Sequence, residues 1–452
     1  MKDLTSGNEA RVILMFSLPM LLGNIFQQLY NTVDSMVVGR HLGKEALAAV
    51  GASFPIVFLL TALTMGISMG STILIAQYYG AKDMGRVKKT IDTTFIFLFF
   101  AALAVTLAGL LLSNSILHFL KVPEDVLPKA RTYLNIIFLG SIVMFGYNTI
   151  SAILRGLGDS KTPLYFLILS TLVNIGLDLL FVISFEWGVA GAAWATVIAQ
   201  GVSFMTALWH LKRRFEIFHI DVRNMQFDRE TLGLSVKIGL PSGIQQTLVS
   251  VGMLSLQSLV NGFGKDALAA YTVAGRLDSF ASMPAMNLSA ALSAFTGQNL
   301  GANKPERVRK GYQASLFMAC IISLALTVVA LTFKESLIAV FNTDPEVLSI
   351  GGRYLSIVSL FYIPFAAMFV TNGLLRGAGA TMTTMTFTMI SQLIVRVPAA
   401  YFLSKRLMSP DGIWWAIPTG WIAGLSLSVS YYLTGKWKEK VIVKRVSATS
   451  GE

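Results

Sequence analysis

Long apolar stretches separated by short polar intervals run along the whole chain of 452 residues. The stretches reach about 20 residues or more, the length that an α-helix needs to cross the hydrocarbon core of a bilayer. The polar intervals have the character of loops at the two membrane surfaces. The pattern therefore predicts an all-α integral membrane protein with twelve transmembrane helices. They are expected near residues 10–38, 46–78, 90–115, 128–155, 161–185, 190–211, 232–260, 268–298, 311–333, 348–376, 382–404 and 412–435.

The two halves of the chain repeat each other at a fixed offset of 221 residues. The matched blocks are HLGKEALAAV at 41–50 with GFGKDALAAY at 262–271, AQYYGAKDMGRVKK at 76–89 with GQNLGANKPERVRK at 297–310, ILRGLGDSKT at 153–162 with LLRGAGATMT at 374–383, and Tyr133-Leu134 with Tyr354-Leu355. Because six spans return the chain to the side where it started, both halves enter the membrane in the same direction. Parallel repeats of this kind are common among secondary transporters.

Two six-helix lobes are therefore expected, separated by the most polar interval between spans, KRRFEIFHIDVRNMQFDR. The predicted limits are 1–211 for the amino-terminal lobe, 212–230 for a cytoplasmic linker, 231–436 for the carboxy-terminal lobe and 437–452 for a cytoplasmic tail.

Charge indicates the orientation. Only 13% of the residues are charged, against about a quarter in soluble proteins. Most of the 36 Lys and Arg lie in the amino terminus, the even-numbered loops and the tail, so the positive-inside rule places both termini in the cytoplasm. We expect a multi-pass protein of the cell membrane. The net charge of +12 is spread over these loops, so no nucleic-acid partner is expected.

A polar stripe crosses the first span. Its side chains are spaced three or four residues apart, so they share one helix face. They are Asn24, Gln27, Gln28, Asn31 and Asp34. An ionised Asp in the middle of a membrane costs about 2.5–3.5 kcal/mol, so such a residue usually faces a cavity or a partner.

Further polar residues share the expected depth of Asp34. Asp178 and Asn174 lie on the fifth span, Thr196 on the sixth and Tyr133 on the fourth, each about one to two turns from the outer surface. Each group can simply bond a neighbouring helix. Two carboxyl groups in one site of low dielectric instead resist double ionisation, so one can exchange a proton. The layer therefore predicts an ion-coupling site for H⁺, or for Na⁺ held by the same oxygens.

The carboxy-terminal half lacks this set. Ser255 stands at the position that matches Asp34, and no acid occurs in 244–260 or 355–375. Asp278 lies two residues from Arg276, near the expected outer end of the eighth span, where the two can pair. The duplication is therefore expected to be functionally asymmetric.

Other chemistry is not indicated. The four His residues are scattered, and no GxxxxGK[ST] loop for a nucleotide occurs. We expect no enzymatic activity, no metal site and no cofactor.

The sequence resembles the MATE family of multidrug and toxic compound extrusion transporters over essentially its whole length. The resemblance rests on Pro19 and Asp34 in the first span, on the paired Q-x-x-G-A blocks at Gln77 and Gln298, and on both LRG-x-G loops. Asn174, Asp178, Thr196 and Tyr133 match the amino-lobe network of the prokaryotic DinF-like branch. The acids that the NorM-like branch carries on its seventh and tenth spans are absent, which favours the DinF-like branch.

The resemblance implies two six-helix bundles around a V-shaped cleft, alternating access, and exchange of inward-moving H⁺ or Na⁺ for an outgoing amphipathic organic cation. It also implies that protonation of Asp34 bends the first helix at Pro19, although a static kink explains this proline equally well. We expect a monomer whose partners are its substrates and the lipid bilayer. Candidate cavity residues, for which packing is the alternative, are Gln27, Asn31, Met382, Met385 and Met389.

Two other functions remain open. The wider superfamily includes flippases of lipid-linked sugars, which need a strongly cationic cavity, whereas Arg276 and Arg396 are the internal arginine candidates here. A non-transporting sensor or channel is the other alternative, and it fits a cluster of proton-site residues poorly.

Overall fold

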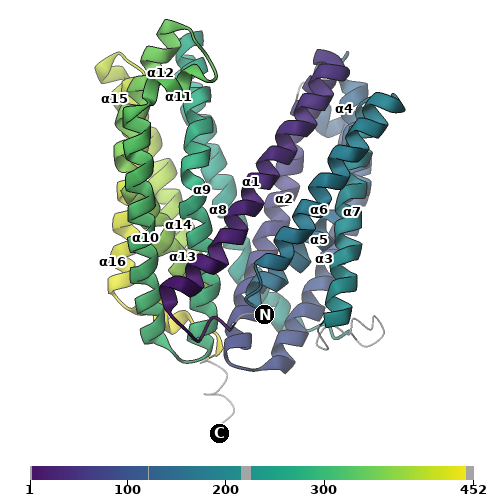
Figure 1. The fold of residues 1–452 in the computed structure, drawn as a ribbon, viewed down its shortest axis with the longest axis vertical. Coiled ribbons are helices and arrows are strands. Elements are labelled where there is room, and N and C mark those ends of the chain that lie inside the picture. Colours follow the sequence, from purple (N-terminus) through teal and green to yellow (C-terminus); the bar gives the residue numbers. More distant parts are fainter. Residues whose placement is uncertain (1–2, 121, 215–224, 444–452) are drawn as a thin grey trace. The chain divides into compact units, whose positions relative to one another are not determined.

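The computed structural model describes residues 3–120, 122–214 and 225–443, which form helices joined by short turns (Figure 1). Contacts divide these residues into two compact units. One unit, the amino-terminal lobe, runs from Leu18 to Leu240. The other, the carboxy-terminal lobe, joins Asp3–Ser17 to the chain from Pro241 onward.

Six spans build the amino-terminal lobe. The fourth consists of two helices that meet at Gly140 with a bend of 51°, and the fifth continues from an α-helix into a π-helix. In chain order the elements are α1 (Glu9–His41), α2 (Gly43–Gly80), α3 (Met84–Phe119), α4 (Leu127–Leu139), α5 (Ser141–Gly156), α6 (Lys161–Asp178), η1 (Leu179–Ser184) and α7 (Gly188–Arg214).

The carboxy-terminal lobe repeats this order of spans. The eleventh span of the chain also contains a π-helix, and a short extra helix follows the ninth span. The elements are α8 (Arg229–Asn261), α9 (Lys265–Gly301), α10 (Pro305–Thr332), α11 (Lys334–Ala339), α12 (Pro345–Val358), η3 (Ser359–Phe361), α13 (Tyr362–Gly377), α14 (Thr381–Met389), η4 (Ile390–Arg396), α15 (Val397–Leu407), α16 (Asp411–Leu433) and η5 (Lys436–Lys440).

The predicted all-α fold with twelve spans is confirmed. By length and composition, seven helices of the described residues are able to cross a membrane, and the bent pair α4–α5 makes an eighth span. The remaining spans, α2, α8, α9 and α16, have 38, 33, 37 and 23 residues. At a rise of about 1.5 Å per residue, even the shortest of these exceeds the hydrocarbon core of about 30 Å.

The repeated sequence blocks mark turns that need a left-handed backbone. Gly43 and Gly264 have φ of 80° and 95°, and Gly158 and Gly379 have φ of 83° and 95°. These pairs stand 221 residues apart, as do Lys82 and Asn303, which have φ of 61° and 56°. Glycine adopts positive φ without steric cost, so the blocks recur because each one starts or ends a helix with the same turn.

The first helix of each half begins in the other unit. In the carboxy-terminal lobe, the Leu4 amide donates to Gln298 Oε1 at 3.1 Å, and Arg307 pairs with Glu9 at 3.1 Å. The start of α8 belongs to the amino-terminal lobe, where it packs against α2. A Cβ on Gly70 would lie 2.0 Å from the Ser235 carbonyl oxygen, so glycine is required at this contact.

The contact-based division therefore differs from the predicted lobe limits at the start of α1 and at the start of α8. The boundaries fall between Ser17 and Leu18 and between Leu240 and Pro241, next to a proline in each helix. Residues 215–224 of the predicted linker and 444–452 of the predicted tail lie outside the described residues. The limits 1–211 and 231–436 stay a prediction.

Candidate ion-coupling site

Two carboxyl groups meet in the amino-terminal lobe. Asp34 lies on α1 and Asp178 is the last residue of α6, and their side chains hydrogen-bond each other. Asp178 is completely buried and Asp34 is half-buried. A carboxylate only accepts hydrogen bonds, so a bond between two carboxyl groups requires a proton on one of them. The geometry therefore fits a pair that shares one proton.

Asn174 holds Asp178 from one turn earlier on α6. With its amide oriented to satisfy both neighbours, its Nδ2 donates to Asp178 Oδ2 at 3.0 Å, and its Oδ1 accepts from the Thr196 backbone N–H at 3.3 Å. Asn174 is fully buried. The amide thus connects α6 to α7 and orients the carboxyl group of Asp178.

A second connection joins α1 to α7. The Tyr30 hydroxyl donates to Thr196 Oγ1 at 3.1 Å. Tyr30 precedes Asp34 by one turn on the same face of α1, so this bond fixes the height at which Asp34 meets Asp178. The phenol of Tyr133 on α4 is buried and interacts electrostatically with both acids.

The surroundings of the pair are apolar. Tyr133 belongs to a buried cluster that includes Val37, Val38, Val182 and Val189, drawn from α1, η1 and α7 as well as α4. One oxygen of each acid, Oδ1, is buried without a hydrogen-bond partner among the described residues. Few dipoles are therefore available to stabilise two negative charges at once, and charges repel strongly where water is excluded.

The structure thus gathers the five residues that the sequence predicts for ion coupling: Asp34, Asp178, Asn174, Thr196 and Tyr133. Their role in coupling stays a prediction. Sequence reasoning missed Tyr30, although its position four residues before Asp34 places it on the same helix face. It also missed the π-helix η1, which begins directly after Asp178. Single π-turns of this kind often occur at functional sites.

The predicted helix bend and the predicted substrate-cavity residues lie outside this site. α1 continues as a helix through Pro19, so bending there stays a prediction. Gln27 and Asn31 are exposed on α1, and the three candidate methionines of α14 are exposed or half-buried. Their lining of a substrate cavity stays a prediction.

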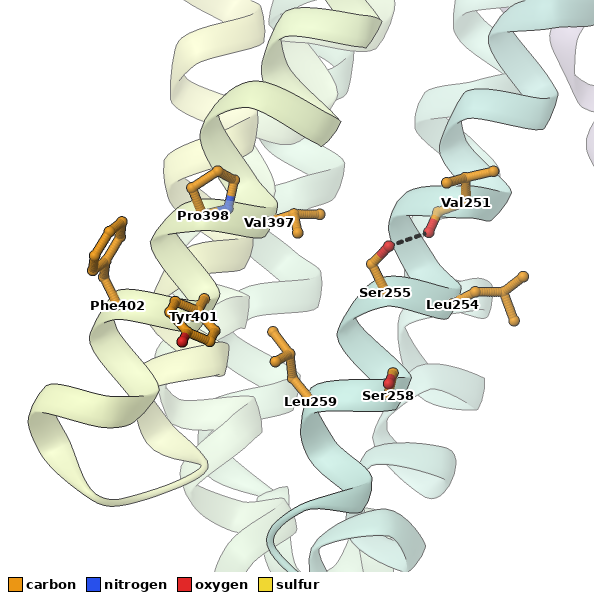
Figure 2. Close-up of a pocket in the computed structure, with 9 residues that line it drawn as sticks. All are labelled: Val251, Leu254, Ser255, Ser258, Leu259, Val397, Pro398, Tyr401 and Phe402. Atoms are coloured by element: carbon orange, nitrogen blue, oxygen red, sulfur yellow. Dashed lines mark hydrogen bonds between the residues drawn. The ribbon is translucent and has the colours of Figure 1, made fainter.

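A large groove lies elsewhere in the described residues. It has a volume of about 710 Å³ and separates α8 from α15 in the carboxy-terminal lobe (Figure 2). Its walls are mainly apolar, and they include Val251, Leu254 and Leu259 on α8 and Val397 and Tyr401 on α15. None of the predicted cavity residues lines it.

The predicted pairing of Asp278 with Arg276 is wrong. Asp278 on α9 accepts hydrogen bonds from the hydroxyls of Tyr354 and Tyr362, at 2.5 Å and 2.6 Å, one on each carboxyl oxygen. Arg276 is exposed, and its guanidinium lies 5.9 Å from the ring centre of Phe341. The two residues are two positions apart, so they do not share a face of the helix.

The family model MatE matches residues 19–180 and again residues 241–402, once in each half of the chain. The chain belongs to the MatE family. The two matches agree with the internal repeat, and the resemblance inferred from the sequence is confirmed.

Two relatives of this MatE chain are named as probable multidrug resistance proteins. The probable multidrug resistance protein YpnP of Bacillus subtilis is 34% identical, over 96% of this chain and 97% of that protein. YoeA of the same organism, also a probable multidrug resistance protein, is 33% identical over 96% of each chain. A MATE transporter solved in its bent conformation is 26% identical, with a TM-score of 0.89 over 98% of each chain.

The MatE chain is therefore a multi-pass membrane transporter of the multidrug-efflux class rather than an enzyme. Among the described residues, no group of three or more His, Cys, Asp or Glu side chains is placed to hold a metal ion. The DinF-like branch stays a prediction.

Proposed function

We propose that this protein is a secondary active antiporter that exchanges inward-moving H⁺ for outgoing amphipathic organic cations by alternating access. The observation that carries the proposal is the direct contact between the carboxyl groups of Asp34 and Asp178. The names of the drug-resistance relatives support the direction and class of transport.

Antiport follows from charge balance at this pair. Two ionised carboxylates in contact within an apolar site are strongly disfavoured, so the site needs one compensating positive charge. A bound proton or the cationic group of a substrate can supply it. Because both ligands neutralise the same charge, each lowers the affinity for the other, and this reciprocity couples their opposite movements.

The two acids have different tasks in this scheme. Asp34 is half-buried and lies on the helix that carries the exposed polar side chains Gln27 and Asn31, so it is the member that meets water and substrate. Asp178 is fully buried and held by Asn174, so it supplies a fixed partner for the proton. The bond from Tyr30 to Thr196 keeps α1 close enough for the two carboxyl groups to touch.

A conformational change at α1 would link protonation to alternating access. Pro19 removes one backbone hydrogen bond from α1, which makes this the point where the helix bends most easily. In this scheme, proton uptake by the pair favours a bent α1 and release of the cation. A static kink at Pro19 would leave the charge competition intact and place the movement elsewhere.

Na⁺ is the second candidate for the coupling ion. The oxygens of Asp34, Asp178, Asn174 and Thr196 are of the type that hard cations prefer. The hydrogen bond between the two carboxyl groups favours H⁺, because a cation between them would separate the oxygens that now share a proton.

Transport driven by separate ion gradients tests this proposal. Proteoliposomes at fixed membrane potential are loaded with a fluorescent organic cation, and either a pH gradient or a Na⁺ gradient is imposed. The pH gradient alone is expected to drive the dye against its concentration gradient. Dye movement driven by Na⁺ at equal pH, with none driven by the pH gradient, would contradict the proton assignment.

A further inference from the structure

The groove between α8 and α15 is open to its surroundings. In Figure 2, Leu259 points from α8 toward α15, and Val397 points from α15 toward α8. Val251, Pro398 and Phe402, which also line the groove, are exposed. Both helices belong to membrane spans, where the surrounding solvent is hydrocarbon. An open, apolar groove of about 710 Å³ between two spans suits a hydrocarbon chain.

The groove has the length of one lipid leaflet. Its lining on α8 runs from Val251 to Leu259, and the helix ends at Asn261. At about 1.5 Å per residue this lining covers about 12 Å of the helix. Half of a hydrocarbon core of about 30 Å is about 15 Å. An acyl chain of one leaflet can therefore lie along the groove with its headgroup at the end of α8.

The walls of the groove offer no charge to an organic cation. Among the described residues that line it, none is acidic. The hydroxyl of Ser255 is already used, since it donates to the Val251 carbonyl oxygen at 2.8 Å (Figure 2). The other polar groups of the lining are the hydroxyls of Ser258 and Tyr401. A neutral chain therefore suits this lining better than a cationic substrate does.

Two adjacent cations follow the groove on α15. The ammonium group of Lys405 donates to the hydroxyl of Tyr401 at 2.5 Å and lies 4.3 Å from the centre of its ring. Lys405 and Arg406 are both exposed. Each stands four residues after an aromatic residue of the groove, so both continue the helix surface that lines it. No ion pair among the described residues includes either cation, so their charges are available to an anion.

The predicted membrane orientation does not account for these cations. Most Lys and Arg of the chain lie in the amino terminus, the even-numbered loops and the tail, whereas Lys405 and Arg406 begin the eleventh loop, on the predicted outer side. Tyr401 and Phe402 are exposed just before them, as aromatic residues at the level of lipid headgroups are. Basic side chains at a membrane surface attract anionic lipids.

We propose that the groove between α8 and α15 binds one anionic phospholipid. One acyl chain lies between the two helices, and the phosphate group is bound by Lys405 and Arg406. The inference is independent of the proposed antiport, because it assigns a structural lipid to the carboxy-terminal lobe rather than a transported substrate. The lipid chain fills the space that separates the end of α8 from α15.

Photo-crosslinking in vesicles tests this site. The full chain, with p-benzoylphenylalanine in place of Ser258, is reconstituted with equal amounts of phosphatidylglycerol and phosphatidylcholine that have identical chains. After irradiation the lipid adducts are identified by mass. The reference position is Leu324, an exposed residue of α10 that does not line the groove. We expect the ratio of phosphatidylglycerol to phosphatidylcholine adducts to be about tenfold higher at Ser258 than at Leu324.

Removal of the two cations is expected to abolish this preference. Lys405→Gln combined with Arg406→Gln should return the adduct ratio at Ser258 to that of the reference position. The matched control is Arg309→Gln combined with Lys310→Gln, which removes two adjacent exposed cations from the start of α10, at the opposite end of the same lobe. This control should leave the ratio unchanged, and an equal loss of preference would show a general attraction of anionic lipid and overturn the inference.

Filling the groove tests the place of the acyl chain. Val397→Trp enlarges a side chain that points toward α8 (Figure 2), so it should lower the yield of lipid adducts at Ser258 and leave the yield at Leu324 unchanged. An unchanged yield at Ser258 would contradict the proposed place of the chain. Equal adduct ratios at the two positions of the otherwise unmodified protein would show that bulk lipid covers the groove. A protein adduct from a second copy of the chain, in place of a lipid adduct, would also overturn the inference.

Discussion

Replacing Asp34 with asparagine is expected to abolish dye transport driven by a pH gradient, with a loss of about a hundredfold or more in rate. Asparagine keeps the size of the side chain and can still hydrogen-bond Asp178. It cannot exchange a proton, and it removes one of the two negative charges whose repulsion makes the pair take up a proton or a cation. The measurement is efflux from cells with matched protein levels, repeated in proteoliposomes. Transport near the unmodified rate would remove Asp34 from the mechanism.

Asp92→Asn is a matched control for this variant. Asp92 is also a buried acid of the amino-terminal lobe, only 3% exposed, but its carboxylate is bound by Lys88 at 2.8 Å on α3. Its replacement removes a buried negative charge away from the acid pair. Transport is expected to continue, so a loss equal to that of Asp34→Asn would indicate a general effect of neutralising acids in this lobe.

Replacing Asp178 with asparagine is expected to uncouple transport rather than stop it. A single carboxylate at Asp34 is no longer forced by a neighbouring charge to hold either a proton or a cation. Dye accumulation against its gradient should therefore fall about tenfold or more, while downhill dye movement continues. The ratio of the two rates in proteoliposomes is the measurement, and an unchanged ratio would show that Asp178 only packs against its neighbours.

Asp278→Asn provides the comparison in the other lobe. Asp278 already has both oxygens bound by tyrosine hydroxyls and is not in contact with a second acid. Its replacement should leave the ratio of accumulation to downhill movement of a simple cation close to that of the unmodified protein. A larger uncoupling by Asp278→Asn than by Asp178→Asn would contradict the assignment of the ion site to the amino-terminal lobe.

The span pattern and the layer of polar residues were predictable because both depend on local geometry. Hydrophobic length fixes the ends of each span, and the rise per residue then fixes the depth of Asp34, Asp178 and Thr196. Equal depth on neighbouring spans places these residues in one layer, and packing of the spans then brings their side chains together. The left-handed turns at Gly43 and Gly264 likewise follow from sequence blocks that repeat at one offset.

Lateral placement was not predictable in the same way. Depth alone does not tell which residue on another helix faces Asp278, so Arg276, near in sequence, was chosen over Tyr354 and Tyr362, which tertiary packing brings to it. The break at Gly140 depends on packing against Val197, whose side chain would lie 2.3 Å from a Cβ at this position. The start of α1 belongs to the carboxy-terminal lobe and the start of α8 to the amino-terminal lobe. The hydrophobic periodicity of the sequence does not indicate either placement.

Proton release on substrate binding tests the central claim most directly. Purified protein in weakly buffered detergent solution near neutral pH is titrated with an organic cation, and a soluble indicator reports the protons released. The account predicts about one proton released per cation bound, because both neutralise the shared charge of Asp34 and Asp178. Asp34→Asn should release none. Cation binding without proton release by the unmodified protein, or equal release by Asp34→Asn, would contradict the account.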